Sequence, residues 1–311
     1  MEAASQFTRI VLYRNPRAGR GGHDPATGLA RVGLCPELQI DRLETVQEQR
    51  WGLDELLVIA GGDGTVNEVV SRLLDRKPRP VIAVLPCGTA NDFARSLGLP
   101  QDLAAACDRL AQSVIREVDA ARINDQILLN AAHIGLGAVI SGREAGDYKG
   151  AWGRLSYLRG LLARLGDGIA LKATVTIADD SGGTDRCFTH RWRNITIANG
   201  HYFGGGHTIG AEAILDDGLL DVLAVRYRPV WRVVAAELGR RFGFRTVEAV
   251  RHWRTRRVSV DTDGAHPVTV DGDIRTRTPL HAETHARALR VLAPAGTVPG
   301  LQSPKVQGKA Q

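Results

Sequence analysis

Short apolar runs alternate with helical patterns along the first 120 residues of the chain. Consecutive apolar residues are typical of strands that are covered on both faces, so the runs predict strands at 10–13, 56–60, 81–85 and 117–120. Between them, apolar residues at helical spacing predict helices at 66–74 and 102–110. This alternation of strands and helices indicates an α/β domain with a parallel sheet, over residues 7–127.

From about residue 128 the pattern changes to longer strand-like runs. They predict strands at 128–134, 171–178, 193–198, 220–225, 258–261 and 268–270. Helical patterns occur only near 155–164 and 230–238. We therefore expect a β-rich second domain over residues 128–294. The remaining segment, 295–311, is rich in Gly, Pro, Gln and Lys, which predicts a disordered tail.

Glycines follow the predicted strand at 56–60, in the run Gly61-Gly62-Asp63-Gly64-Thr65. Glycine permits positive φ and lets the main chain approach a ligand closely, and the helix that follows directs its positive end at the loop. The run therefore predicts a phosphate-binding loop, with the Thr65 hydroxyl as a further donor. Asp63 is unexpected beside an anion unless a cation lies between them, which indicates Mg²⁺.

A tight turn is the alternative explanation of these glycines, since Gly and Asp are common turn residues. The same order of strand, glycine loop and helix recurs after the strand at 81–85, where Gly88-Thr89 forms the loop and Asn91 or Asp92 begins the helix. A third loop, at 15–22, follows the first strand. Loops at the carboxyl ends of neighbouring parallel strands meet at one edge of a sheet, so the repetition favours a common binding site.

In combination, these motifs resemble the bacterial diacylglycerol kinase family, which shares its catalytic domain with sphingosine and ceramide kinases. The resemblance rests on Asn67-Glu68 after the glycine loop, on the run 199–206, on Asp216-Asp217-Gly218 and on Asp271-Gly272-Asp273. It implies an N-terminal domain like those of NAD kinases and phosphofructokinases, a C-terminal β-sandwich, and an active site in the cleft between them.

The resemblance also implies an ATP-dependent transfer of phosphate to a lipid hydroxyl, with diacylglycerol as the default acceptor. By similarity, the nucleotide would be held by Asn15, Pro16, Arg17, Ala18, Gly19, Thr45, Gly62, Asp63, Gly64, Thr65, Val66, Asn67, Glu68 and Thr89. Asp63, Asp92 and Asp119 would surround the catalytic Mg²⁺. A second, structural Mg²⁺ would be held by Asp217 and the main-chain carbonyls of Ile214 and Leu219, although spacing alone favours a plain hairpin turn there.

The catalytic base is where the sequence departs from the family pattern. Relatives usually carry Asp-Gly-Glu, and this chain has Asp271-Gly272-Asp273, one methylene shorter at the last position. An Asp carboxylate still accepts a proton, but its reach falls by about 1.5 Å, a displacement that costs on the order of a hundredfold in rate. We assign Asp273 as the base.

Three other functions remain open from the sequence: a sphingosine or other lipid kinase, an NAD kinase, and a nucleotide-binding module that has lost catalysis. NAD kinases share the glycine loop, but Asn67-Glu68 and the loop at 86–92 favour the lipid kinases. The shortened Asp273 is what supports the inactive module. His133 and His207, which lie beside glycines, are interpreted as structural or surface residues, because the carboxylates already serve the chemistry.

The formal net charge of +6 favours anionic partners. No nucleic-acid-binding motif is present, and aromatic residues among arginines at 230–257 suit a membrane headgroup layer, with a solvated basic face as the alternative. No apolar stretch is long enough to span a bilayer, and the four cysteines form no C-x-x-C pair. We expect a cytoplasmic protein in peripheral contact with the membrane's inner face; relatives often dimerise, which leaves a homodimer open.

Overall fold

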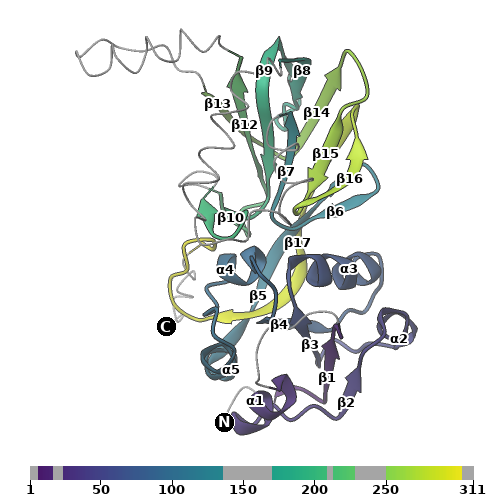
Figure 1. Ribbon diagram of the computed structural model, residues 1–311, viewed down its shortest axis with the longest axis vertical. Coiled ribbons are helices and arrows are strands. Elements are labelled where there is room, and N and C mark those ends of the chain that lie inside the picture. The colour runs from purple at the N-terminus through teal and green to yellow at the C-terminus, as the bar shows by residue number, and fades with distance from the viewer. Residues whose placement is uncertain (1–5, 17–23, 136–169, 209–212, 228–249, 303–311) are drawn as a thin grey trace, which may run out of the picture.

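Two lobes stand one above the other in the computed structural model, which describes residues 6–16, 24–135, 170–208, 213–227 and 250–302 (Figure 1). The lower lobe contains four parallel strands: β1 (Arg9–Arg14), β2 (Leu38–Ile40), β3 (Glu55–Gly61) and β4 (Val81–Pro86). They lie in the order β2-β1-β3-β4, with all neighbouring pairs parallel. The α/β fold predicted from the alternation is confirmed.

Helices connect these strands and pack against the sheet. They are α1 (Pro25–Arg31), α2 (Leu43–Glu48), α3 (Asp63–Leu73), α4 (Asp92–Ser96) and α5 (Leu103–Ala111). The predicted helices at 66–74 and 102–110 correspond to α3 and α5. Side chains of the Asp24 and Asp102 N-caps accept hydrogen bonds from the first turns of α1 and α5, which satisfies donors that have no partner within the helix.

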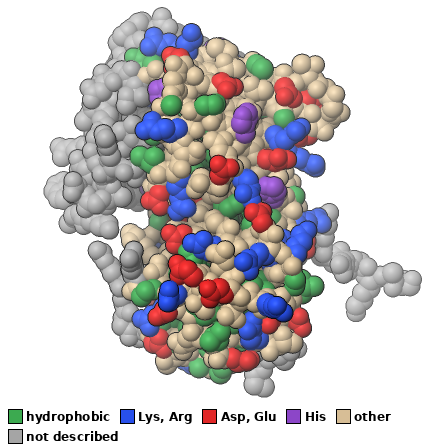
Figure 2. Space-filling view, turned by 90° about the vertical axis from the view of Figure 1, so that its right-hand side faces the viewer, with side chains coloured by type: hydrophobic (Ala, Val, Ile, Leu, Met, Phe, Trp, Pro, Cys, Tyr) green, Lys and Arg blue, Asp and Glu red, His purple; other side chains and the backbone are tan. Residues whose placement is uncertain are grey.

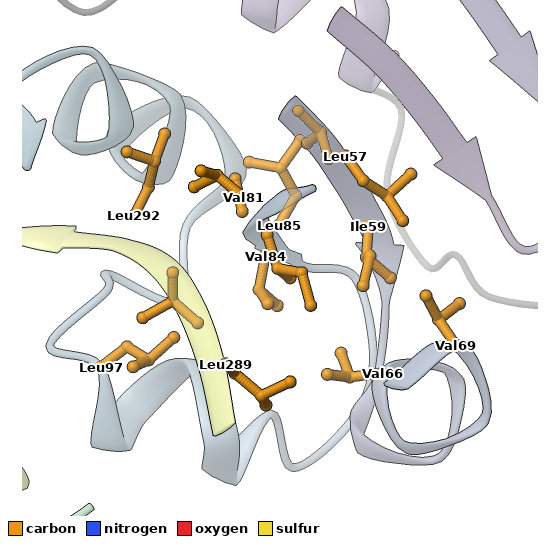
Figure 3. Packing of buried hydrophobic residues seen from close by; sticks show 14 of the residues in the cluster. Leu57, Ile59, Val66, Val69, Val81, Val84, Leu85, Leu97, Leu289 and Leu292 are labelled. Carbon is orange, nitrogen blue, oxygen red and sulfur yellow. The ribbon is translucent and has the colours of Figure 1, made fainter. Parts of the chain in front are cut away.

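One part of the core of the lower lobe lies between α3 and the sheet. Side chains of Leu57 and Ile59 on β3 meet Val66 and Val69 on α3, together with Leu289 from the far end of the chain (Figure 3). All five are at most 2% exposed. Burying side chains of this size contributes about 1.5–3 kcal/mol each, so the apolar stripe of α3 fixes how the helix lies on the sheet.

The upper lobe is built from antiparallel strands. They include the last part of β5 (Ser113–Ile123), whose first part lies in the lower lobe, together with β6 (Gln126–Leu128), β7 (Ala131–Gly135), β8 (Leu171–Ile177), β9 (Arg186–Ala198), β12 (Leu220–Arg226), β13 (Val250–Thr255), β14 (Arg257–Thr262), β15 (Pro267–Val270) and β16 (Asp273–Arg277). A separate hairpin joins β10 (Tyr202–Phe203) to β11 (His207–Thr208). A second core, which includes the fully buried Trp192, lies among these strands.

One long strand, β17 (Leu280–Pro294), belongs to both lobes. Its first part pairs with β14 of the upper lobe, and its last part lies parallel to β4 while pairing with β5 along most of its length. An irregularity between His285 and Leu289 bends it, with Arg287 at a φ of +53°. The expected second domain, 128–294, therefore includes residues whose side chains complete the core of the first lobe, Leu289 and Leu292 among them.

The strand expected at 128–134 is interrupted. β6 ends at Leu128 and β7 begins at Ala131. The N–H groups of Leu129, Asn130 and Ala131 donate to the carboxylate of Asp271 instead of to a neighbouring strand. The other predicted strands of this half are present, whereas the helices predicted near 155–164 and 230–238 lie outside the described residues.

The segment after β17 is packed as far as the structure describes it. Val298 and Leu301 are each 4% exposed and lie in the core of the lower lobe. The carbonyl of Gly300 accepts a hydrogen bond from the Leu215 N–H at 2.8 Å. The expectation of a disordered tail is therefore wrong for residues 295–302, because two apolar side chains and backbone pairing anchor them; residues 303–311 lie outside the described ranges.

Basic and acidic side chains are interspersed over both lobes on the face shown in Figure 2. The described part of this face carries no patch of a single sign. Most of the region proposed to contact a membrane, 230–257, lies outside the described residues. Among the helices that the structure does describe, none is long and apolar enough to cross a bilayer.

Candidate active site at the junction of the lobes

Two glycine loops of the lower lobe meet backbone to backbone. A Cβ on Gly88 would lie 2.4 Å from the Cα of Gly62, and a Cβ on Gly61 would lie 2.5 Å from the side chain of Thr65. None of Gly61, Gly62 and Gly64 has a positive φ. The glycines are needed here for close approach between chain segments, not for the left-handed backbone that the sequence also permitted.

Asn91 stabilises the second loop. It has a φ of +53°, its Oδ1 accepts the N–H of Gly88 at 2.8 Å, and its Nδ2 donates to the Gly88 carbonyl at 3.0 Å. The next residue, Asp92, opens α4 and accepts hydrogen bonds from the N–H groups of Gly205 and Gly206 at 2.7–3.1 Å. Asp92 thus attaches the glycine-rich β10–β11 turn to the lower lobe, and burial raises its pKa.

Asp63 is the first residue of α3 and faces the junction of the lobes. Its Oδ1 accepts hydrogen bonds from the Phe93 N–H at 2.9 Å and from Asn130 Nδ2 at 3.3 Å. Its second oxygen, Oδ2, receives no hydrogen bond from the described part of the chain. The buried Oδ1 of Asn130 likewise has no partner there. A buried polar atom without a partner is uncommon, so this corner has capacity for a cation, a hydroxyl or water.

Nucleotide contacts predicted from the sequence fall into three groups. Asn15 Nδ2 donates to Thr65 Oγ1 at 2.8 Å, which joins the first loop to the second. A second group is partly or fully exposed and consists of Pro16, Thr45, Gly62, Gly64, Glu68 and Thr89. The third group is buried, since Val66 and Asn67 are at most 1% exposed. The side chains of this last pair therefore stabilise the fold. Arg17, Ala18 and Gly19 lie outside the described residues.

Asp271 occupies the tight turn between β15 and β16, where it has a φ of +49° and Gly272 a φ of +97°. Its carboxylate accepts hydrogen bonds from Asn67 Nδ2 at 2.7 Å and from the N–H groups of Leu129, Asn130 and Ala131 at 2.8–3.2 Å. Burial raises its pKa to about 6 in spite of these donors. The hairpin that carries Asp273 is therefore attached to α3.

Asp273 itself is open to solvent, with its side chain 69% exposed. Its Oδ2 lies 3.3 Å from an NH2 group of Arg275. The other arm of the same guanidinium donates to Asn67 Oδ1 at 2.9 Å. Arg275 thus links the expected base to the helix behind the glycine loop, a role that its local sequence does not indicate because Asn67 lies more than 200 residues earlier in the chain.

Asp119 lies in a different cluster from Asp63. Its two carboxylate oxygens accept the N–H groups of Gly218 at 2.6 Å and Arg287 at 2.7 Å, and burial raises its pKa. Asp216 contributes to that rise, which places Asp119 beside the Asp216-Asp217-Gly218 loop. The sequence grouped Asp63, Asp92 and Asp119 around one ion; the structure joins Asp119 to the loop instead, because two backbone donors hold its side chain there.

Other buried polar residues were not anticipated as part of the site. Asn130 and Asn199 are 4% and 1% exposed, and each has an unpartnered amide oxygen. A signal was present, since Asn130 lies inside the predicted strand at 128–134 and Asn199 directly follows the one at 193–198, where an amide is costly to bury without a purpose. His133 is buried against Phe203, and burial lowers its pKa to about 4, consistent with a structural role.

Comparisons with known proteins agree on one family. The diacylglycerol kinase catalytic domain matches residues 36–123, and the YegS C-terminal NAD kinase beta sandwich-like domain matches residues 131–293. A Pseudomonas aeruginosa protein named "Probable lipid kinase YegS-like" is 32% identical over 254 residues, covering 80% of this chain and 79% of that protein. A Klebsiella pneumoniae protein of the same name is 37% identical over 235 residues, covering 70% and 73%.

Solved structures show the same fold. The crystal structure of a diacylglycerol kinase from Bacillus anthracis has a TM-score of 0.69 at 23% identity and covers 93% of this chain and 97% of its own. A second crystal structure from that organism has a TM-score of 0.73 at 23% identity, covering 94% and 99%. Together, the fold and the two matched domains define a two-lobed kinase. The chain belongs to the bacterial diacylglycerol kinase family of lipid kinases.

Proposed function

We propose that this protein transfers the γ-phosphoryl group of ATP to a lipid hydroxyl, with diacylglycerol as the acceptor and phosphatidic acid as the product. The residue on which the proposal depends most is Asp63. It stands at the first turn of α3, directly after the glycine loop, and one of its carboxylate oxygens has no partner among the described residues. Family membership supplies the reaction class.

The N-terminal turn of α3 is the proposed site of the phosphates. The helix is 11 residues long, its N-cap is Gly62, and no side chain caps it, so its first N–H groups are available to an anion. The open space around Gly64 gives a ligand access to the main chain. The Asn15–Thr65 hydrogen bond holds the first loop beside this turn.

The residues around Asp63 fit a divalent cation that arrives with the nucleotide. Mg²⁺ is usually held in such sites by one or two carboxylates together with phosphates and water. Within the described ranges, no group of three His, Cys, Asp or Glu side chains is arranged so that it could hold a metal ion. When bound, Mg²⁺ would neutralise charge on the transferring phosphate. Asp63 is the carboxylate with a free oxygen for it, while Asp92 holds the turn at Gly205.

Asp273 is the proposed base for the acceptor hydroxyl. Its exposure leaves its carboxylate accessible to a substrate that approaches from outside, and Arg275 fixes one of its oxygens. The nucleotide would be held at α3, and Asp273 lies on the hairpin that is attached to α3. This arrangement would bring the phosphoryl donor and the acceptor hydroxyl together, with no further covalent step by the protein. The lipid acceptor implies peripheral contact with a membrane surface.

A parallel assay distinguishes the proposal from its alternatives. The purified chain would be incubated with radiolabelled ATP and Mg²⁺, and diacylglycerol, sphingosine and NAD would be offered separately. We expect labelled phosphatidic acid, and its loss in Asp63→Asn. Product from sphingosine or NAD alone would replace the proposed substrate. No product from any acceptor, with ATP binding intact by calorimetry, would instead support the nucleotide-binding module that the short Asp273 side chain also permits.

A further inference from the structure

Four aspartates surround the turn between residues 214 and 221, and in three of them both carboxylate oxygens already have donors. Asp119 accepts two backbone N–H groups, as described above. Asp216 accepts the Gln302 N–H at 2.7 Å and lies 3.4 Å from Arg116. Asp217 Oδ1 accepts the Leu219 N–H at 2.9 Å, and its Oδ2 contacts the guanidinium of Arg254. Every carboxylate oxygen of these three aspartates therefore has a donor from the protein.

Arg254 bridges two of the buried carboxylates. It lies on β13, directly opposite Asp221 on β12. One nitrogen contacts Asp217 Oδ2, and its Nε lies 3.7 Å from Asp221 Oδ1. The side chains of Asp217 and Asp221 are only 7% and 3% exposed. His252, two residues earlier on the same strand, lies 2.6 Å from Asp221.

This arrangement does not fit the structural Mg²⁺ that the family resemblance implies at Asp217. An ion there would compete with the guanidinium for the same carboxylate oxygen and would meet a like charge at contact distance. We propose that Arg254 takes the place of that divalent cation, so that the Asp217 turn is held without metal. The proposal concerns the stability of the upper lobe and does not depend on the reaction or on the acceptor.

A guanidinium is suited to this role. It is always charged, and its planar group of donors can serve two carboxylates at once. Arg254 belongs to β13, which is paired with β12. Its positive charge is therefore part of the fold and, unlike a bound metal ion, cannot dissociate into the solvent. Burying two ionised aspartates without a compensating charge would be costly, and Arg254 supplies that charge.

Metal content and thermal unfolding of the unliganded protein test the proposal. Protein purified without chelator should contain less than one tightly bound divalent ion per chain. Its unfolding temperature should change by no more than about 1 °C between EDTA and millimolar Mg²⁺ or Ca²⁺ at matched ionic strength. A stoichiometric ion, or a stabilisation of several degrees that Asp217→Asn removes, would overturn it.

Variants at Arg254 supply the converse test. Arg254→Met keeps the aliphatic stem and removes the charge, so the unfolding temperature in EDTA should fall by about 5 °C or more. Mg²⁺ or Ca²⁺ should restore part of this loss, and the double variant with Asp217→Asn should not respond. Arg251→Met, an exposed arginine on the same strand, is the control and should behave as the parent.

Equal stability and equal metal response in Arg254→Met and the parent would contradict the proposal. If Arg254→Met does not fold, Arg254→Lys takes its place in the same comparison. Lysine retains the charge but not the fork that reaches both carboxylates. The expected outcome is then a smaller loss in EDTA with partial recovery by Ca²⁺, and the absence of any loss would again count against Arg254.

Discussion

Asn67 connects three parts of the candidate site through one fully buried side chain. Its Nδ2 donates to Asp271 and to the Ile127 carbonyl, at 2.7 and 2.8 Å, while its Oδ1 accepts from Arg275. The sequence predicts that Asn67 lies beside the glycine loop, where the structure has it, and that it contacts the nucleotide. With no exposed surface, its side chain instead joins α3 to the β15–β16 hairpin.

Asp273 is the residue at which activity should be most sensitive to side-chain length. Asp273→Asn should lower kcat by at least about a hundredfold, since loss of a general base typically costs that much, and should leave ATP binding unchanged. Asp273→Glu restores the methylene found in relatives and should match or exceed the parent rate. Turnover of the Asn variant at the parent rate would remove Asp273 from the role of base.

Arg275 should act as a positioning residue for Asp273. Arg275→Met should lower kcat about tenfold with little change in KM for ATP, because the carboxylate loses one orienting contact. Arg275→Lys should recover part of the rate. Arg277→Met, on the same strand but bonded to the Ala265 carbonyl, is the matched control. A parallel loss of stability and rate in both variants would indicate a purely structural role.

The raised pKa of Asp271 predicts a specific pH dependence of stability. The folded state holds the proton up to a pKa of about 6, well above the ordinary value of 3.8, so it binds more protons than the unfolded state between these values. The contribution of this group to the free energy of unfolding therefore falls as pH rises from 4 to 6, by about 3 kcal/mol at most.

Urea unfolding at a series of pH values would measure this effect as the difference between the parent and Asp271→Asn, in which the group does not titrate. The difference should shrink from about pH 4 and level off above pH 6–7. A difference that stays constant with pH would show that Asp271 has its ordinary pKa in the folded protein.

At the scale of elements, the sequence predicted what local pattern determines. Apolar runs at 56–60 and 81–85 define β3 and β4, and the stripe at Val66, Val69 and Val70 defines α3. Long-range pairings left no such local signal. β17 is one strand of 15 residues with a bend, and nothing in its own sequence indicates that it pairs with β14, β4 and β5.

The candidate site likewise has features that local sequence predicts and features that depend on long-range contacts. Glycines and aspartates of the loops could be found from spacing, because a phosphate loop needs them at fixed offsets. The partners of Asp92, Asp119 and Asp271 could not, because each lies far away in the chain. Asp92, for example, accepts from Gly205 and Gly206, more than a hundred residues further on.

Contact between the two glycine loops predicts a contrast between two alanine substitutions. Gly88→Ala should destabilise the fold by about 1–3 kcal/mol, because its Cβ would overlap the Gly62 backbone. Gly64→Ala should be neutral or slightly stabilising, because nothing lies within 4 Å of the added carbon and alanine favours the helix.

Gly64→Ala should nevertheless weaken ATP binding, about tenfold or more, if the phosphates approach this main chain. Thermal unfolding and calorimetry with ATP would be measured for both variants. Gly264→Ala, also with open space around its Cβ but distant from the loop in sequence, controls for the substitution itself. Undiminished ATP binding in Gly64→Ala would place the phosphates elsewhere.

For the whole molecule, β17 should make the two lobes unfold together. Leu289 is 2% exposed and completes the lower core from a strand that begins in the upper lobe. Leu289→Ala should lower the free energy of unfolding by about 2–5 kcal/mol and keep a single transition in calorimetry. Leu53→Ala, 59% exposed, should change it by less than about 0.5 kcal/mol. Two resolved transitions would show that the lobes are independent.

This route of β17 has a consequence for synthesis on the ribosome. The α/β lobe emerges first, yet the edge of β4 and the apolar layer above it are completed only by β17, from a segment more than 190 residues after β4. Until about 290 residues have been translated, that edge is exposed and able to pair with other nascent chains. Truncation before residue 280 should therefore yield aggregates, and a chaperone that covers strand edges would benefit this protein more than its modest size suggests.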